Sequence, residues 1–321
     1  MGNCLGSSAP RSNLSLPTER PEEEILSSPG LKAFSIYELK TAIQYFDSLT
    51  EEGGSDLVFK GWIDEQTLSP STPETGMVVA FKNLKPEGFH GDKEYWLSEL
   101  NYIGQLHHPN LVKLFGYCLD GQDWFLVYEY LAKGRLENHL FGDHEGIQPL
   151  SWETRMKVAI GAAKGLCFLH DVEPQVIYRY LDASNILLDD DFNVKLQAYV
   201  STQVNDIQGY ATQGYADTVF APGCVSAMSD VYSYGILLLV LLTGRKPLTK
   251  SMIGDQRLLN WVTLFRRKLI QIMDTKLERQ YPENAAITIA TLALQCTHFN
   301  PSFRPKMSEV LEKLQKALTL L

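Results

Sequence analysis

A lysine and a glutamate are the first residues that could act together chemically. Lys82 ends a strand-like run at 79–82, and Glu99 follows on a predicted helix, on the same face as Trp96 and Leu100. A carboxylate on a buried face needs a partner, so we expect Glu99 to pair with Lys82. A lysine held in this way can bind phosphate groups. The pair alone is weak evidence for such a site, because ion pairs are common on protein surfaces.

Further motifs follow this pair in a fixed order. They lie at residues 107–114, 125–131, 176–189, 229–235 and 303–307. This order and spacing resembles the protein kinase domain, and in particular the plant receptor-like cytoplasmic kinases, over about residues 34–320. The Met-Gly-x-Cys start and the run Phe-Ser-Ile-Tyr-Glu-Leu at 34–39 are similar to that family as well.

The resemblance implies an α+β fold of two lobes. The kinase-like domain is expected over residues 34–321, with a small β-rich N-lobe at about 46–131 and a larger helical C-lobe at about 132–320. Residues 1–33, rich in Ser, Pro and Glu, are expected to form a flexible tether.

The resemblance also implies a nucleotide site. Lys82 and Glu99 match the strand lysine and the helix glutamate that hold ATP phosphates, and Asn185 matches the metal-binding asparagine. The sequence leaves two interpretations open: a leftover ion pair that only stabilises the small lobe, which we favour, or a working site. In the glycine-rich loop only Gly53 remains, because the other two glycine positions hold Glu51 and Asp56. Acidic side chains there repel phosphate.

The catalytic loop departs from the family pattern at two positions. It reads Tyr178-Arg179-Tyr180, so that Tyr180 stands where the family has the aspartate that accepts the substrate proton. A phenol with a pKa of about 10 is a poor base near neutral pH. Asp182 stands where the family has a lysine, which reverses the charge near the transferred phosphoryl group.

The metal motif departs as well. Ala198 takes the place of the aspartate that binds magnesium.

The segment after Ala198 looks short, and Ser201 and Thr202 match the hydroxyl pair that is phosphorylated or attacked by bacterial effectors in such kinases. Plain solvation of these two hydroxyls is the other interpretation. The family's Ala-Pro-Glu motif falls on residues 212–214, without the glutamate, so Arg304 needs another partner or solvent.

The N-terminus predicts a membrane address. Gly2 becomes the first residue once Met1 is removed, as N-myristoylation requires, and Cys4 is placed for S-palmitoylation. Gly6 departs from the Ser or Thr of the strict motif. One acyl chain anchors only marginally and two anchor stably, so we expect the cytoplasmic face of the plasma membrane. An ordinary N-terminus without acylation is the alternative.

The surrounding sequence predicts the elements that position these residues. Strands are expected at 58–64 and 77–82, two more around a turn at Gly121, and helices at 93–105, around Met156–Leu166 and at 307–318. The apolar run 235–242 is shorter than the about 20 residues that span a bilayer, so it is expected to be a buried core helix.

Composition excludes several classes of protein. The chain has 321 residues, 29 Lys and Arg against 38 Asp and Glu, and a net charge of −9, which argues against nonspecific binding of nucleic acid. Its five widely spaced cysteines indicate neither a disulfide framework nor zinc.

Together these features predict a membrane-tethered kinase fold without catalysis, that is, a pseudokinase. It would act as a scaffold, decoy or regulator in receptor-kinase signalling, including immune signalling, with receptor kinases, other cytoplasmic kinases or immune receptors as partners. No cofactor would be required, and ATP with magnesium would bind weakly. The alternatives are a weakly active serine/threonine kinase, supported by Lys82, Glu99 and Asn185, and a switch that binds ATP without transferring phosphate.

Overall fold

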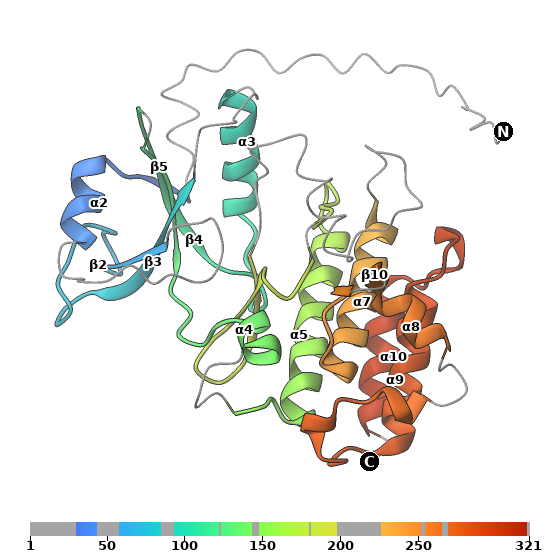
Figure 1. The fold of residues 1–321 in the computed structure, drawn as a ribbon. Helices are drawn as coiled ribbons and strands as arrows, with labels where there is room; N and C mark the ends of the chain where they lie inside the picture. Colours follow the sequence, from blue (N-terminus) through green and yellow to red (C-terminus); the bar gives the residue numbers. More distant parts are fainter. Residues whose placement is uncertain are drawn as a thin grey trace, which may run out of the picture.

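The computed structural model describes residues 30–43, 58–84, 93–121, 123–142, 148–179, 181–197, 226–251, 254–264 and 269–319. Within these ranges the chain forms a sheet-containing N-lobe and a helical C-lobe (Figure 1), as predicted.

The N-lobe is built on a five-stranded sheet in the order β1-β4-β5-β3-β2. Its strands are β1 (Lys32–Ala33), β2 (Val58–Ile63), β3 (Met77–Leu84), β4 (Leu114–Asp120) and β5 (Asp123–Glu129). β1 runs parallel to β4, and the other neighbours are antiparallel. Helices α2 (Ile36–Ile43) and α3 (Lys93–Gly104) flank the sheet (Figure 1). The strands at 58–64 and 77–82, the two strands around Gly121 and the helix at 93–105 are therefore confirmed.

Side chains alternate between the two faces of this sheet. On β5, Leu126 and Tyr128 pack in the same cluster as Leu100 of α3, whereas Phe125 and Val127 pack with Leu39 of α2. This is the period of two that a strand imposes. Each face of the sheet is thus closed by one helix.

The packed chain begins earlier than the sequence predicted. Leu31, Phe34, Leu39 and Ala42 are all buried, and β1 pairs with β4. The predicted tether through residue 33 and the N-lobe start near 46 therefore differ from the structure. The reason is that Leu31 and Phe34 on either side of β1, and Leu39 and Ala42 on α2, bury apolar surface against the sheet.

The C-lobe consists mainly of helices. These are α4 (Leu136–Phe141), α5 (Trp152–Asp171), α7 (Ala227–Thr243), α8 (Leu258–Leu264), α9 (Glu283–Cys296) and α10 (Met307–Thr319), with 3₁₀ turns at Leu269–Ile272, Thr275–Leu277 and Pro301–Phe303. The C-lobe also contains two small sheets. One consists of β6 (Gly134–Arg135), β7 (Ile186–Leu188) and β8 (Val194–Leu196), and the other of β9 (Leu248–Ser251) and β10 (Gly254–Arg257). The predicted helices around Met156–Leu166 and at 307–318 are present.

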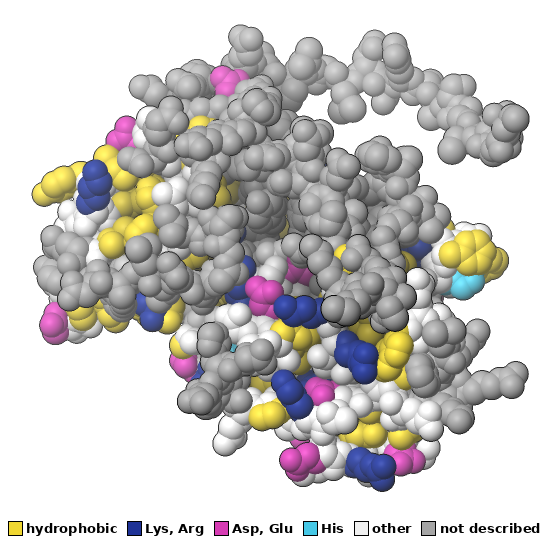
Figure 2. Space-filling view, in the orientation of Figure 1, with side chains coloured by type: hydrophobic (Ala, Val, Ile, Leu, Met, Phe, Trp, Pro, Cys, Tyr) yellow, Lys and Arg dark blue, Asp and Glu magenta, His cyan; other side chains and the backbone are white. Residues whose placement is uncertain are grey.

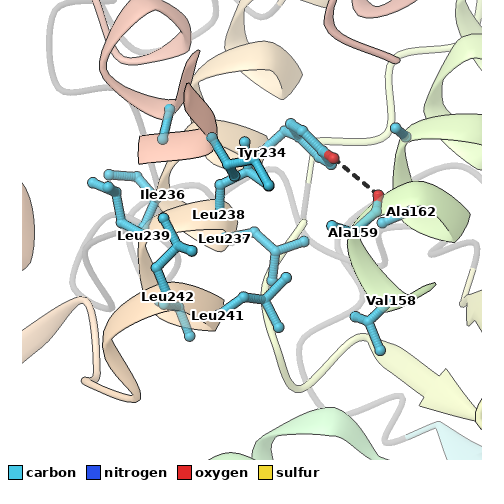
Figure 3. Packing of buried hydrophobic residues seen from close by; sticks show 14 of the residues in the cluster. Val158, Ala159, Ala162, Tyr234, Ile236, Leu237, Leu238, Leu239, Leu241 and Leu242 are labelled. Carbon is cyan, nitrogen blue, oxygen red and sulfur yellow. Dashed lines mark hydrogen bonds between the residues drawn. The ribbon is translucent and has the colours of Figure 1, made fainter. Parts of the chain in front are cut away.

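Helix α7 is the centre of the C-lobe core. Every residue from Asp230 to Thr243 is buried, and the helix ends at Gly244, whose φ of 63° is left-handed. Figure 3 shows its leucines gathered around the helix, and Tyr234 donating a hydrogen bond of 2.9 Å to the carbonyl oxygen of Ala159 on α5. The run 235–242 is thus a buried core helix, as predicted. Among the described residues, none of the helices has the length and apolarity to cross a membrane.

Candidate active site

Part of the predicted site lies outside the described residues. This holds for Gly53, Glu51, Asp56, Tyr180, Ala198, Ser201, Thr202 and residues 212–214, and for the lipidation residues Gly2 and Cys4. Predictions about their side chains stay predictions. The described part of the site consists of Lys82, Glu99 and the catalytic-loop residues on either side of Tyr180. It also includes residues 129–131, the segment that joins the lobes.

Lys82 lies on β3, in register with Val58 of β2 and Leu126 of β5. Its side chain is only 5% exposed. It lines a small cavity of about 40 Å³ between the lobes. The other lining residues are Val58, Ala80, Tyr128, Glu129, Tyr130, Leu131, Arg135, Leu187 and Gln197. Small-molecule sites usually measure about 300–1,000 Å³, so this cavity must widen before a nucleotide fits.

Glu99 lies on α3 and is half-buried. Its pairing with Lys82 stays a prediction. Two other cavity residues were not singled out from the sequence. Arg135 follows Gly134, whose φ of 64° turns the chain at the start of the C-lobe, and Gln197 follows β8. A basic residue directly after a glycine turn was the available signal for Arg135.

The backbone of Asn185 is fixed between the catalytic loop and the end of β8. Its N–H donates to Oδ1 of Asp182 at 3.0 Å, and its carbonyl oxygen accepts the N–H of Gln197 at 3.1 Å. The hydroxyl of Tyr178 donates to the carbonyl oxygen of Gln197 at 2.7 Å. Burial raises the pKa of this phenol well above its usual value, so Tyr178 is neutral. Hydrogen bonds therefore connect the catalytic loop with the residue that follows β8.

Asp182 points into its own turn. Its side chain is 3% exposed, and its Oδ1 accepts hydrogen bonds from the N–H and hydroxyl of Ser184 and from the N–H of Asn185. Burial raises the pKa of this carboxyl, and the hydrogen bonds of Ser184 oppose the shift. Whether Asp182 also lies beside bound phosphates stays a prediction, because the geometry shows only its contacts within the turn. A short aspartate can accept from N–H groups two and three residues ahead, whereas a lysine could not.

The catalytic loop is anchored to α7 by Asp230. This carboxylate is 1% exposed and accepts the backbone N–H groups of Tyr178 and Arg179, each at 2.8 Å. His170 Nε2 lies 2.9 Å from Asp230 Oδ2. Arg179 takes a φ of 70°, a strained backbone for a residue with a Cβ. The two hydrogen bonds that Asp230 accepts hold the loop in this conformation.

Arg304 finds its partners among backbone carbonyls. Its guanidinium group is buried and donates to the carbonyl oxygens of His298 at 2.7 Å and Met228 at 2.9 Å. It also lies over the ring of Tyr232, 5.1 Å from the centroid. The sequence predicted another partner or solvent for Arg304, and the structure shows partners: the carbonyl oxygen of His298 after α9 and that of Met228 at the start of α7.

The comparison with protein families decides the assignment. A family model described as protein tyrosine and serine/threonine kinase matches residues 50–314. The chain belongs to the protein kinase family. It is 55% identical over 321 residues to the probable serine/threonine-protein kinase PBL3 of Arabidopsis thaliana, an alignment that covers 94% of this chain and 74% of that protein.

A second plant relative gives the same result. The chain is 46% identical over 317 residues to the serine/threonine-protein kinase BIK1 of Arabidopsis thaliana, covering 93% of this chain and 79% of that one. These similarities to plant kinases agree with the resemblance to plant receptor-like cytoplasmic kinases. The kinase fold with its two lobes is thereby established for this chain.

Proposed function

We propose that this kinase-family protein has lost phosphoryl transfer and acts as a scaffold, decoy or regulator in receptor-kinase signalling. One observation carries the proposal: Tyr180 and Ala198 stand where kinases have the aspartates that take the substrate proton and bind magnesium. A general base contributes typically about 10²–10⁴-fold to the rate, and the loss of the metal ligand adds to this loss.

Among the residues that the structure describes, the carboxylate of the catalytic loop does not supply the missing metal ligand. Magnesium is held by carboxylates, waters and substrate phosphates. Asp182, the carboxylate next to Asn185 in the loop, is buried and uses its Oδ1 for three hydrogen bonds within the turn. Asn185 with Ala198 is therefore a poor ligand set, and the described residues of the loop do not fit a magnesium site of the kind that kinases use.

The scaffold of the domain is nevertheless intact. Asp230 holds the catalytic loop on α7, and α7 itself is fully packed. A fold that is kept while its chemistry is absent suits a protein that works through its surface. The resemblance suggests receptor kinases, other cytoplasmic kinases and immune receptors as partners. Ser201 and Thr202 are proposed as a modification site.

Location at the plasma membrane is part of the proposal. It is supported by Gly2 and Cys4 in the first residues of the chain. Two acyl chains would hold the protein stably at the cytoplasmic face, where receptor kinases present their own kinase domains.

An active kinase is the second candidate. It is supported by the buried Lys82 on β3, by Asn185 in its loop position, and by relatives whose names are those of serine/threonine kinases. In this case ATP and magnesium would be needed, and another group would have to supply the base and the missing metal ligand.

A nucleotide titration combined with a transfer assay separates these candidates. The full chain is mixed with adenosine, ATP or Mg-ATP while its thermal unfolding is followed, and labelled phosphate incorporation is measured in parallel. The proposal predicts weak binding that magnesium does not improve, and no incorporation beyond that of Lys82→Ala. Micromolar, magnesium-dependent ATP binding without transfer would support an ATP switch. Incorporation that depends on Lys82 would support an active kinase.

A further inference from the structure

A groove outside the candidate active site lies beside the segment that joins the lobes. It has a volume of about 450 Å³. It is formed by the loop after α3, the residue before β4, the end of β5, and β8. Its lining residues are Leu106, His107, His108, Pro109, Leu111, Lys113, Glu129 and Lys195.

The groove is basic, although the chain as a whole carries a net charge of −9. Its one acid, Glu129, is already used: Lys195 Nζ lies 2.9 and 3.1 Å from its two carboxylate oxygens, and the N–H of Lys113 donates to Oε1 at 2.7 Å. The Lys113 ammonium lies over the ring of Phe115, 4.8 Å from the centroid, and the residue is exposed. On the face in view, Figure 2 shows basic and acidic side chains interspersed over the C-lobe. Because Lys195 is paired with Glu129, Lys113 is the lysine of this groove that offers its charge to a negatively charged group.

The surroundings of His108 also indicate positive charge beside the groove. Burial lowers the pKa of this histidine, whose ring stacks on Phe168, and the charges of Lys164 and Lys195 lower it further. His108 is therefore neutral at neutral pH, while Lys164, exposed on α5, adds positive charge near the groove. An anion bound here would meet the charges of Lys113 and Lys164, and would compete with Glu129 for Lys195.

The described chain begins beside this groove. Leu31 packs against Gly104, two residues before the groove wall at Leu106. β1 runs parallel to β4, with Lys32 opposite Gly116. Because the two strands are parallel, Gly30 and Leu31, which precede β1, lie at the same end of the sheet as Lys113, which precedes β4. The residues before Gly30 are therefore connected to the described chain at the end of the sheet where the groove lies.

These 29 residues contain a strongly acidic stretch. Glu22, Glu23 and Glu24 are consecutive, and Glu24 precedes Gly30 by only a few residues. An extended chain spans at most about 3.3–3.6 Å per residue, so this stretch can cover about 20 Å from Gly30. A short connection gives the acidic stretch an effective concentration of about millimolar at the groove. Even a weak charge interaction would then form in a large share of the molecules.

We propose that the acidic stretch at residues 22–24 docks in this basic groove of its own chain. Its carboxylates would contact Lys113 and Lys164 and compete with Glu129 for Lys195. The docked stretch would fix the start of the N-terminal segment beside the segment that joins the lobes. This proposal stands apart from the proposed loss of catalysis, because the groove lies outside the residues on which that loss depends.

Zero-length carbodiimide cross-linking of the full chain, read by mass spectrometry, tests the proposal. Glu129 and Lys195 form an internal positive control, because their side chains already lie 2.9 Å apart. The proposal predicts cross-links from Glu22, Glu23 or Glu24 to Lys113 or Lys164. The yield should fall several-fold in 1 M salt, where charges are screened beyond about 3 Å.

Matched variants and labelling decide between occupants. In a mixture of ¹⁵N-labelled and unlabelled protein, the cross-links should join residues of the same chain. Lys113→Gln should reduce them several-fold, whereas Lys313→Gln, an exposed lysine on α10, should leave them unchanged. Three results would overturn the proposal: links only between labelled and unlabelled chains, which would indicate a second copy; links to Lys313 as frequent as those to Lys113; or no groove links while the Glu129–Lys195 link forms.

Discussion

Replacing Asp182 tests whether its carboxylate supports the loop or faces the nucleotide. In Asp182→Ala, the N–H groups of Ser184 and Asn185 lose their acceptor, and so does the Ser184 hydroxyl. A buried donor left without a partner costs about 1–3 kcal/mol. The Ser184 hydroxyl can turn to another acceptor, so the two backbone N–H groups determine the effect. We expect the free energy of unfolding to fall by about 2–4 kcal/mol.

Asp182→Asn is the matched control. The amide oxygen can accept the same hydrogen bonds without the cost of a buried charge, so this variant should unfold within about 1 kcal/mol of the natural chain. A kilocalorie shifts the melting temperature by about 2 °C in a domain of this size range, so Asp182→Ala should melt about 4–8 °C lower.

The difference in stability between the natural chain and Asp182→Asn should depend on pH. Burial raises the pKa of Asp182 above its ordinary value of 3.8. Between that value and the raised one, the folded state binds more protons than the unfolded state, so the free energy of unfolding falls as the pH rises through this window. Asp182→Asn lacks this term, and its stability relative to the natural chain should therefore improve from pH 4 to pH 7.

Thermal unfolding followed by circular dichroism, at several pH values, measures both effects. The reasoning would be refuted if Asp182→Ala were as stable as Asp182→Asn, since the carboxylate would then hold no turn. It would also be refuted if Asp182→Lys, which restores the residue of the family, were as stable as the natural chain and bound ATP more tightly.

Three further predictions follow from the buried contacts, the N-terminus and the small cavity. Arg155 Nη2 lies 2.6 Å from Asp274 Oδ2 within the C-lobe, so Asp274→Ala should lower the free energy of unfolding in urea by about 3–5 kcal/mol; a loss below about 1 kcal/mol would contradict this. Gly2→Ala should move the protein to the cytosol in membrane fractionation and Cys4→Ser should weaken its retention; membrane-bound Gly2→Ala would contradict dual acylation. In calorimetry, adenosine should bind about as well as ATP, because acidic residues stand at two glycine positions of the loop; a magnesium-dependent preference for ATP would disprove this.

Much of the fold could be predicted because periodic burial leaves a direct trace in the sequence. The apolar run at 235–242 lies in α7, and the two strand-like runs around Gly121 are β4 and β5. The start of the packed chain could not be placed in this way. Leu31 and Phe34 are isolated apolar residues beside a polar stretch, and their burial depends on β1 joining the edge of β4.

The candidate site shows the same limit. The spacing of motifs located Lys82 and Asn185, because the order of elements around them is long and specific. It could not give the direction of the Asp182 side chain, which depends on the local turn rather than on alignment with a lysine. The sequence Asp-Ala-Ser-Asn at 182–185 did contain a signal, since aspartate often accepts hydrogen bonds from N–H groups just ahead of it.

Phosphoryl transfer under single-turnover conditions tests the central claim most directly. Full-length natural protein and Lys82→Ala are each mixed with labelled Mg-ATP and a general protein substrate, and phosphate incorporation is followed over hours. Tyr180→Asp is included as a third protein. We predict no incorporation above Lys82→Ala in either the natural chain or Tyr180→Asp, because position 198 still holds alanine. Incorporation by the natural chain that Lys82→Ala abolishes would contradict the account and show an active kinase.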